Sequence, residues 1–230
     1  MARVGGIILA AGRAARFQAP DGGHKLLAPV HGLPLVRLSV SSAVAAAAHT
    51  TSLADIVVVT GYRGAAVQEA LRGLPVRIVH AEQYAEGMAA SLRCGLTALG
   101  ESVDAVVVAL GDQPGVRPEA YARVIGAWRR TERPIVVPRY AGPSTPNHPV
   151  LFAAGVFPEL RLLQGDAGAR AVIARDPRRV HVEELEWTAP GDVDVAGDVA
   201  LVTAQLDAAA GRGLGGAAHR SGISTPNADS

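Results

Sequence analysis

Short apolar runs alternate with longer segments of helical composition along this chain, and that alternation limits the possible folds more than any other feature. The runs, several of them rich in Val and Ile, span residues 4–9, 56–60, 76–80, 106–110, 135–137 and 150–152. The helical segments span residues 35–48, 65–72, 88–99, 119–130 and 199–210. Strands that alternate with helices assemble into a parallel sheet covered on both faces. The pattern therefore predicts an α/β fold built on a mostly parallel sheet.

The length of 230 residues suits one compact domain. With 49% hydrophobic and 19% charged residues, the chain is too apolar to be disordered as a whole. Residues 211–230 carry few large apolar side chains, so that ordering them would bury little surface. We expect a globular domain over residues 1–210 and a disordered tail over residues 211–230.

Membranes and nucleic acids are not expected as partners. No apolar run approaches the roughly 18 residues of a membrane helix. The 22 basic and 21 acidic side chains give no bulk field for nucleic acid, and 4% aromatic residues argue against a base-stacking platform. Cys94 is the single cysteine, which excludes an internal disulfide and suits a reducing cytosol. We therefore expect a soluble, cytoplasmic protein that binds any phosphate locally.

A cationic loop follows the first apolar run. It consists of Leu9, Ala10, Ala11, Gly12 and Arg13, followed by Arg16 and Lys25. Gly12 lets backbone N–H groups approach an anion, while the arginines supply forked donors and Lys25 a mobile charge. The loop is neither a Walker A sequence nor G-x-G-x-x-G, and its spacing alone also suits an ordinary basic loop. The residue types favour a cradle for the phosphates of a nucleotide.

Two acidic groups are candidate ligands for Mg²⁺. Asp112 closely follows the run 106–110, which would place its carboxylate at the carboxyl edge of a central strand. Mg²⁺ prefers one or two carboxylates, together with waters and substrate phosphates. Asp192 and Asp194 share one side of an extended segment, and one of them could meet Asp112 at a shared metal. The alternatives are a turn-forming aspartate in Gly-Asp-x-Pro and, downstream, a solvated acidic turn.

Further polar residues lie in other predicted loops. His148 is a candidate donor to a phosphate or a pterin-like ring. Arg170 could clamp an anion, and Asp166 is expected to cap the helix that presents Arg170. A histidine beside two prolines is also typical of a structural role. Gly87 and Ser91 would suit a ribose or the edge of a base. No G-x-S-x-G elbow, H-E-x-x-H motif or paired Cys and His indicates another chemistry.

Taken together, residues 4–204 resemble the MobA-like nucleotidyltransferases, and most closely the branch of molybdenum cofactor cytidylyltransferases. The resemblance implies a Rossmann-like nucleotidyltransferase fold with helices on both faces of the sheet. It also implies three groups of site residues: Leu9 to Arg13, Arg16 and Lys25 for the nucleotide, Asp112 and Asp194 for Mg²⁺, and His148, Asp166 and Arg170 for the cofactor substrate. Ala11 looks like the cytidine-using form of the loop, whereas a second glycine at that position accompanies guanosine use, so the resemblance favours CTP.

The chain also departs from this pattern. Ala14 and Ala15 replace hydroxyl residues, Phe17 replaces a methionine, and residues 18–24 form a longer link to the lysine. The turn from Asp112 to Gly115 is similar to that of a subgroup named for nicotine blue oxidoreductase, an NAD(P)H-dependent activity.

Three functions follow from these features. The leading expectation is Mg²⁺-dependent transfer of CMP from CTP to a molybdopterin-type cofactor, with release of pyrophosphate. In that reaction Arg13, Lys25 and Asp112 would carry catalysis. The alternatives are an NAD(P)H-dependent reductase of an aromatic dye, and a non-catalytic nucleotide-binding chaperone that hands cofactor to a client molybdoenzyme.

Overall fold

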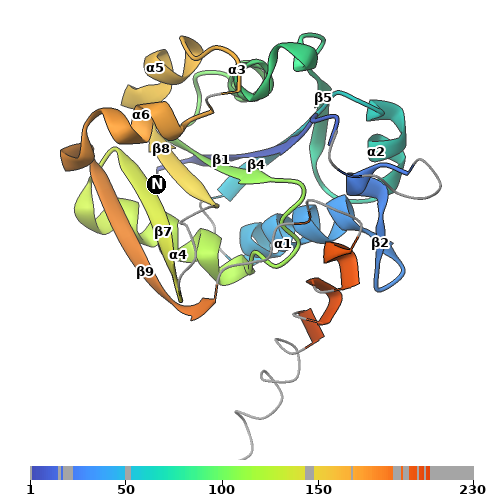
Figure 1. Cartoon of the computed structure of the whole chain (residues 1–230). Helices are drawn as coiled ribbons and strands as arrows, with labels where there is room; N and C mark the ends of the chain where they lie inside the picture. The colour runs from blue at the N-terminus through green and yellow to red at the C-terminus, as the bar shows by residue number, and fades with distance from the viewer. Residues whose placement is uncertain are drawn as a thin grey trace, which may run out of the picture.

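Seven strands form one sheet in the computed structural model, in the order β5-β4-β1-β6-β8-β7-β9 (Figure 1). They span Val4–Ala10 (β1), Leu53–Thr60 (β4), Arg77–His80 (β5), Ala105–Leu110 (β6), Ile135–Ala141 (β7), Val150–Ala153 (β8) and Val180–Thr188 (β9). A separate antiparallel hairpin consists of β2 (Pro29–Val30) and β3 (Leu33–Pro34). The structure describes residues 2–14, 17, 23–49, 53–142, 148–166, 168–188, 193, 197–200, 202–204 and 206–207.

The strand directions confirm the predicted fold class. β1 pairs parallel with β4 and β6, β4 with β5, and β7 with β9. β8 runs antiparallel to both of its neighbours, β6 and β7. Leu9 lies opposite Leu110 in the ladder between β1 and β6, so the chain leaves both strands at the same edge of the sheet. The loops that carry Gly12 and Asp112 therefore start side by side.

Helices cover both faces of the sheet (Figure 1). They span Leu35–His49 (α1), Gly64–Ala70 (α2), Met88–Leu99 (α3), Pro118–Thr131 (α4), Phe157–Arg161 (α5) and Arg170–Arg175 (α6), with short 3-10 turns at Lys25–Leu27, Tyr84–Glu86, Ala154–Val156 and Pro177–Arg179. Ile8 of β1 packs in the core shared with α1 and α4, whereas Ile7 packs in the core shared with α3 and α5. Because alternate side chains of a strand point to opposite faces, each apolar run contributes to both cores.

Most of the predicted elements recur in the structure, whereas β2, β3, α5 and β9 were not predicted. The six apolar runs lie in β1, β4, β5, β6, β7 and β8, and four of the helical segments lie in α1 to α4. β9 was not predicted, because glutamates interrupt its apolar residues and leave no continuous apolar run. No helix in the described ranges is both long enough and apolar enough to cross a membrane.

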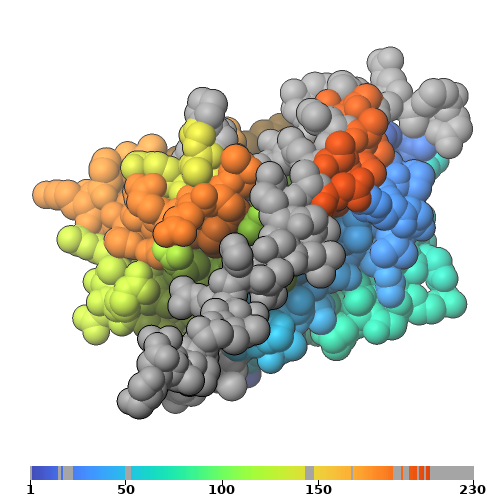
Figure 2. All heavy atoms as spheres, turned by 90° about the horizontal axis from the view of Figure 1, so that it is seen from below, coloured from blue at the N-terminus to red at the C-terminus, as the bar shows by residue number. Residues whose placement is uncertain are grey.

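The predicted helix at residues 199–210 is only partly within the described residues. Of that segment, residues 199–200, 202–204 and 206–207 are helical, and the predicted tail at 211–230 lies outside the described residues. His31 of the β2–β3 hairpin lies 3.5 Å from Asp207, measured from Nε2 to Oδ1. Figure 2 shows these late residues, in red, against the blue surface of the N-terminal part of the chain. The segment therefore packs back onto the start of the domain.

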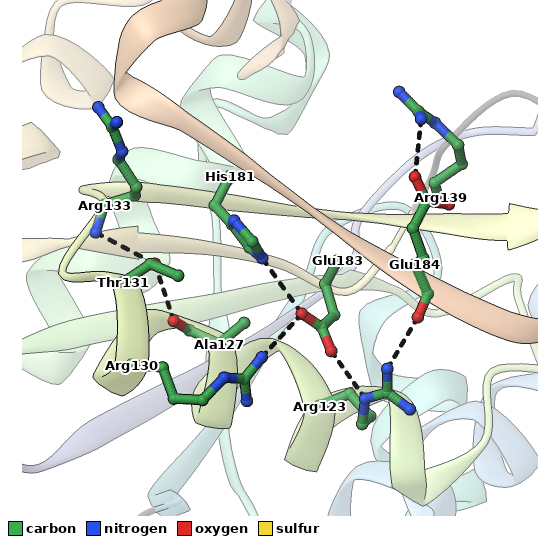
Figure 3. Close-up of polar contacts among 9 residues, drawn as sticks. All are labelled: Arg123, Ala127, Arg130, Thr131, Arg133, Arg139, His181, Glu183 and Glu184. Atoms are coloured by element: carbon green, nitrogen blue, oxygen red, sulfur yellow. Dashed lines mark hydrogen bonds and ion pairs between the residues drawn. The ribbon is translucent and has the colours of Figure 1, made fainter.

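A buried carboxylate fastens β9 to α4 (Figure 3). The side chain of Glu183 is 7% exposed and accepts hydrogen bonds from Arg123 Nε at 2.8 Å and Arg130 Nη2 at 3.1 Å. His181 Nε2 lies 3.2 Å from the same carboxylate. Burial opposes ionisation of Glu183, but the hydrogen bonds from Arg123 and His181 outweigh it and hold the pKa below that of an ordinary glutamate.

Replacing Glu183 with glutamine should lower the free energy of unfolding by about 2 kcal/mol at neutral pH, because charge-assisted hydrogen bonds are lost. Since the folded state lowers the pKa of Glu183, its stabilisation is complete above the ordinary glutamate pKa of about 4.3 and is lost as the pH falls through the lower folded value. Urea unfolding of both proteins between neutral and acidic pH measures this difference. Glu184→Gln is the matched control, because Glu184 forms an exposed pair with Arg139 and should change stability by at most about 0.5 kcal/mol. A constant difference down to the lowest pH would contradict the assignment.

Candidate active site

Lys25 and Asp112 meet at the carboxyl edge of the sheet. Lys25 Nζ lies 2.7 Å from Asp112 Oδ2, although 87 positions separate the two residues in the chain. Lys25 is buried at the start of a 3-10 turn, and Asp112 follows β6 through the turn at Gly111. The ion pair joins the cationic loop to the carboxylate that the sequence placed after the central strand. One shared site therefore contains both groups.

A cavity of about 520 Å³ opens beside this ion pair. Predicted site residues form most of its wall: Leu9, Ala10, Ala11, Gly12, Arg13, Lys25, Gly87, Ser91, Asp112 and Asp166. They come from the ends of β1 and β6, the 3-10 turn at Lys25–Leu27, the start of α3 and the loop before α6. The volume suits a small organic molecule such as a nucleotide.

The fold itself gives no reason for glycine at position 12. A Cβ built on Gly12 would meet no described atom within 4 Å, and the φ angle of Gly12 is not in the left-handed region. The space in front of Gly12 belongs to the cavity. The absent side chain therefore leaves room for a ligand to approach the backbone.

The start of α3 forms a second wall of the cavity. Gly87 has φ 112° and ψ −179°, and its backbone lies against Gly165. Met88 N–H donates to Asp166 Oδ1 at 3.3 Å, and Ala89 N–H donates to the Gly165 carbonyl at 3.0 Å. Asp166 was predicted to cap the helix that presents Arg170; this is wrong, because α6 begins after Ala169 without a side-chain cap and Asp166 binds the N-terminus of α3 instead.

Two residues near the site had no earlier assignment: Tyr84, which lines the cavity, and His24, which contacts the cationic loop from behind. The Arg13 guanidinium carbon lies 5.7 Å from the centre of the Tyr84 ring, which is within cation–π range. His24 Nε2 lies 3.1 Å from the Gly12 carbonyl oxygen, behind the cationic loop. The only sequence signals for these two residues were their positions: Tyr84 lies three residues before Gly87, and His24 directly precedes Lys25.

Of the other predicted site residues, two are described and do not line the cavity, and two lie outside the described residues. His148 precedes β8, and its carbonyl accepts a hydrogen bond from Tyr140 Oη at 2.6 Å. Arg170 begins α6. Neither residue lines the cavity. Arg16 and Asp194 lie outside the described residues, so their expected roles stay predictions.

The carboxylate of Asp112 fits a divalent cation that takes few protein ligands. Its Oδ2 pairs with Lys25, while its Oδ1 is buried and has no hydrogen-bond partner in the part of the chain that is described. The same part holds no group of three or more His, Cys, Asp or Glu side chains arranged for a metal. Such a donor set suits Mg²⁺, which retains waters and binds substrate phosphates, better than a metal enclosed by protein ligands.

The sheet is mostly parallel, and the ends of its strands carry a glycine loop, cations and a carboxylate over one cavity. This arrangement is typical of an α/β nucleotide-binding domain. Residues 6–182 match the family described as MobA-like NTP transferase domain. The chain belongs to this family.

Solved structures and a curated relative are similar to this chain. The homologue of Mycobacterium tuberculosis Rv0371c from Mycobacterium sp. strain JC1 is 27% identical, with a TM-score of 0.74 over 90% of this chain and 98% of that one. The complex of Rv0371c from M. tuberculosis H37Rv with manganese is 25% identical, with a TM-score of 0.65 over 88% and 98%. The bifunctional protein GlmU of Syntrophotalea carbinolica is 32% identical over 132 residues, which are 57% of this chain. That match spans only 26% of the length of GlmU.

Proposed function

We propose that this protein transfers CMP from CTP to the terminal phosphate of a molybdopterin-type cofactor and releases pyrophosphate. The observation that carries the proposal is the contact between Lys25 and Asp112 at 2.7 Å, on the rim of a cavity that Gly12 and Arg13 also line. The family supports nucleotidyl transfer. The choice of CTP depends on Ala11, and the molybdopterin acceptor depends on the resemblance to the cytidylyltransferase branch.

The two walls of the cavity suit different parts of a nucleotide. Gly12, Arg13 and Lys25 offer backbone access and positive charge, which favours the triphosphate. The wall at the start of α3 offers Ser91 and the carboxylate of Asp166, which can accept hydrogen bonds from ribose hydroxyls or a base amino group. Because Asp166 already binds the N-terminus of α3, that wall is less suited to an anion.

The reaction requires alignment and charge neutralisation more than a general base. A phosphate monoester has its second pKa at about 6, so the acceptor is largely ionised at neutral pH. Arg13 and Lys25 would hold the departing pyrophosphate and stabilise its developing charge. Asp112 would hold Mg²⁺ through Oδ1, and the bound ion would supply charge neutralisation at the phosphate oxygens.

Parallel measurements of pyrophosphate release and NAD(P)H oxidation test this function. The protein is incubated with molybdopterin-type cofactor and CTP, GTP or ATP, with and without a chelator. We expect pyrophosphate release with CTP that the chelator abolishes, and no oxidation of NAD(P)H with an aromatic dye. NAD(P)H oxidation that resists the chelator, without pyrophosphate from any nucleotide, would favour the reductase. CTP binding without turnover would favour the chaperone.

Replacing Gly12 with alanine should weaken CTP binding at least about tenfold while leaving the fold intact. Because the φ angle of Gly12 lies outside the left-handed region and a Cβ meets no described atom, the free energy of unfolding should stay constant or rise by about 0.4–1 kcal/mol. Calorimetric titration with CTP and thermal unfolding measure the two effects. Gly155→Ala is a matched control, since a Cβ at Gly155 also meets nothing described within 4 Å and Gly155 does not line the cavity. Equal CTP affinity in both variants would place the phosphates elsewhere.

A further inference from the structure

His24 is a buried polar residue that the proposed reaction does not use. It is 4% exposed and directly precedes the 3-10 turn at Lys25–Leu27. Its Nε2 lies 3.1 Å from the carbonyl oxygen of Gly12, twelve residues earlier in the chain. Its ring also contacts the ring of Tyr62, with centres 5.4 Å apart. The side chain thus lies behind the cationic loop and not within the cavity wall.

The contacts of His24 define which ring nitrogen carries the proton. A carbonyl oxygen only accepts hydrogen bonds, so Nε2 must be the donor to Gly12. Nδ1 is buried and has no hydrogen-bond partner among the described residues. Burial lowers the pKa of His24 against the opposing effect of the Gly12 carbonyl, and the nearby charges of Arg63 and Lys25 lower it further. The neutral ring with hydrogen on Nε2 is therefore the form that fits this site.

Two successive carbonyl groups of the loop accept hydrogen bonds from neighbouring protein groups, and so both point into the protein. Tyr62 N–H donates to the Ala11 carbonyl at 3.1 Å, and His24 binds the Gly12 carbonyl. In a trans peptide unit the N–H points opposite to the carbonyl of the same unit. The N–H groups of Gly12 and Arg13 are therefore directed away from Tyr62 and His24. No described residue accepts a hydrogen bond from either group, and both residues line the cavity.

We propose that His24 is a positioning residue: its Nε2–H fixes the Gly12 carbonyl so that the backbone N–H groups of Gly12 and Arg13 bind the polyphosphate of the nucleotide. This inference rests on the proposed function, because it requires a triphosphate in the cavity. In this inference, His24 orients the loop, and Arg13 binds the polyphosphate through its backbone N–H as well as through its guanidinium.

Paired substitutions of His24 test the inference through binding alone. His24→Met retains a side chain of similar length but removes the donor, and should raise the Kd for CTP and for inorganic tripolyphosphate about tenfold. His24→Gln places an amide N–H near the position of Nε2 and should restore both affinities to within about threefold of the wild type. Cytidine, which lacks phosphates, should bind all three proteins equally. If both variants bind tripolyphosphate like the wild type, or lose it equally, the inference is wrong.

Nitrogen NMR of the wild-type protein provides a test that needs no variant. We expect the His24 ring to carry hydrogen on Nε2 and a bare Nδ1, and tripolyphosphate to shift the amide signals of Gly12 and Arg13. A ring with hydrogen on Nδ1, or amide signals that do not respond to bound tripolyphosphate, would overturn the inference. If the wild-type protein binds neither CTP nor tripolyphosphate, the proposed function itself fails. The two failures are therefore distinguishable.

Discussion

Replacing Asp112 with asparagine should reduce pyrophosphate release from CTP on the order of 10³-fold, because an amide cannot neutralise and hold Mg²⁺ as a carboxylate does. Asp112 Oδ1 is buried without a hydrogen-bond partner among the described residues, whereas Oδ2 binds Lys25. Binding of CTP in the absence of metal should not weaken, since the substitution removes a negative charge from the phosphate side of the cavity. Turnover with varied Mg²⁺ and calorimetric titration with CTP separate these effects.

The matched control for Asp112 lies at the other end of the same strand. Asp104 precedes β6, and its Oδ2 accepts a hydrogen bond from the Arg3 N–H at 2.7 Å. Asp104→Asn should leave turnover unchanged. Chelator-sensitive turnover within a few-fold of the wild type in Asp112→Asn would remove Asp112 from the mechanism.

A double substitution distinguishes the structural part of this ion pair from its chemical part. Asp112→Asn leaves the buried Lys25 ammonium without its carboxylate, which should lower the free energy of unfolding by about 2 kcal/mol. Lys25→Met in the same protein removes the buried ammonium and should recover much of that stability. Turnover should stay low, because neither the carboxylate nor the ammonium is restored.

Replacing Gly87 with alanine should lower the free energy of unfolding by at least about 3 kcal/mol and abolish CTP binding. The pair φ 112° and ψ −179° lies in a region that is essentially restricted to glycine. A Cβ would also lie 2.4 Å from the carbonyl carbon and 2.6 Å from the carbonyl oxygen of Gly165. Since both contacts are with backbone, the loop that carries Asp166 must move away from the start of α3.

Gly100, at the other end of α3, provides the control for this substitution. Its φ of 73° and ψ of −163° belong to the same glycine region, but a Cβ there would meet no described atom within 4 Å. Gly100→Ala should therefore cost only the backbone strain of about 1–3 kcal/mol and leave CTP binding intact. Urea unfolding gives both costs, and hydrogen exchange at the Ala89 N–H, which donates to Gly165, reports the loop directly. Equal losses in the two variants would show that the contact with Gly165 contributes nothing.

The order of strands and helices could be read from the sequence because it depends on local composition. Val106 to Leu110 are apolar on both sides of the strand, which is the pattern of a strand buried under helices on both faces. β9 could not be read in this way. It lies at the edge of the sheet and exposes several of its side chains, and its buried Glu183 is paired with Arg123 and Arg130 of α4.

The sequence identified many residues of the candidate site, but it did not predict which of them contact each other. Gly12 and Asp112 were recognisable because each lies shortly after a predicted strand, and Lys25 because it follows the cationic loop. Their residue types suit the binding of phosphate and metal. Asp166 was predicted to cap the wrong helix, because the sequence shows only that it precedes α6. Its hydrogen bond to Met88 depends on how the loop packs against α3.

Local composition was enough to predict an α/β fold, a cationic loop after the first strand and an aspartate after the central strand. The pairing of β1 with β6, the contact of Lys25 with Asp112 at 2.7 Å and the contact of His24 with Gly12 became visible only in the folded chain. Such contacts arise from the register of the strands and the burial of side chains, and these are properties of the whole packed chain, not of any local segment.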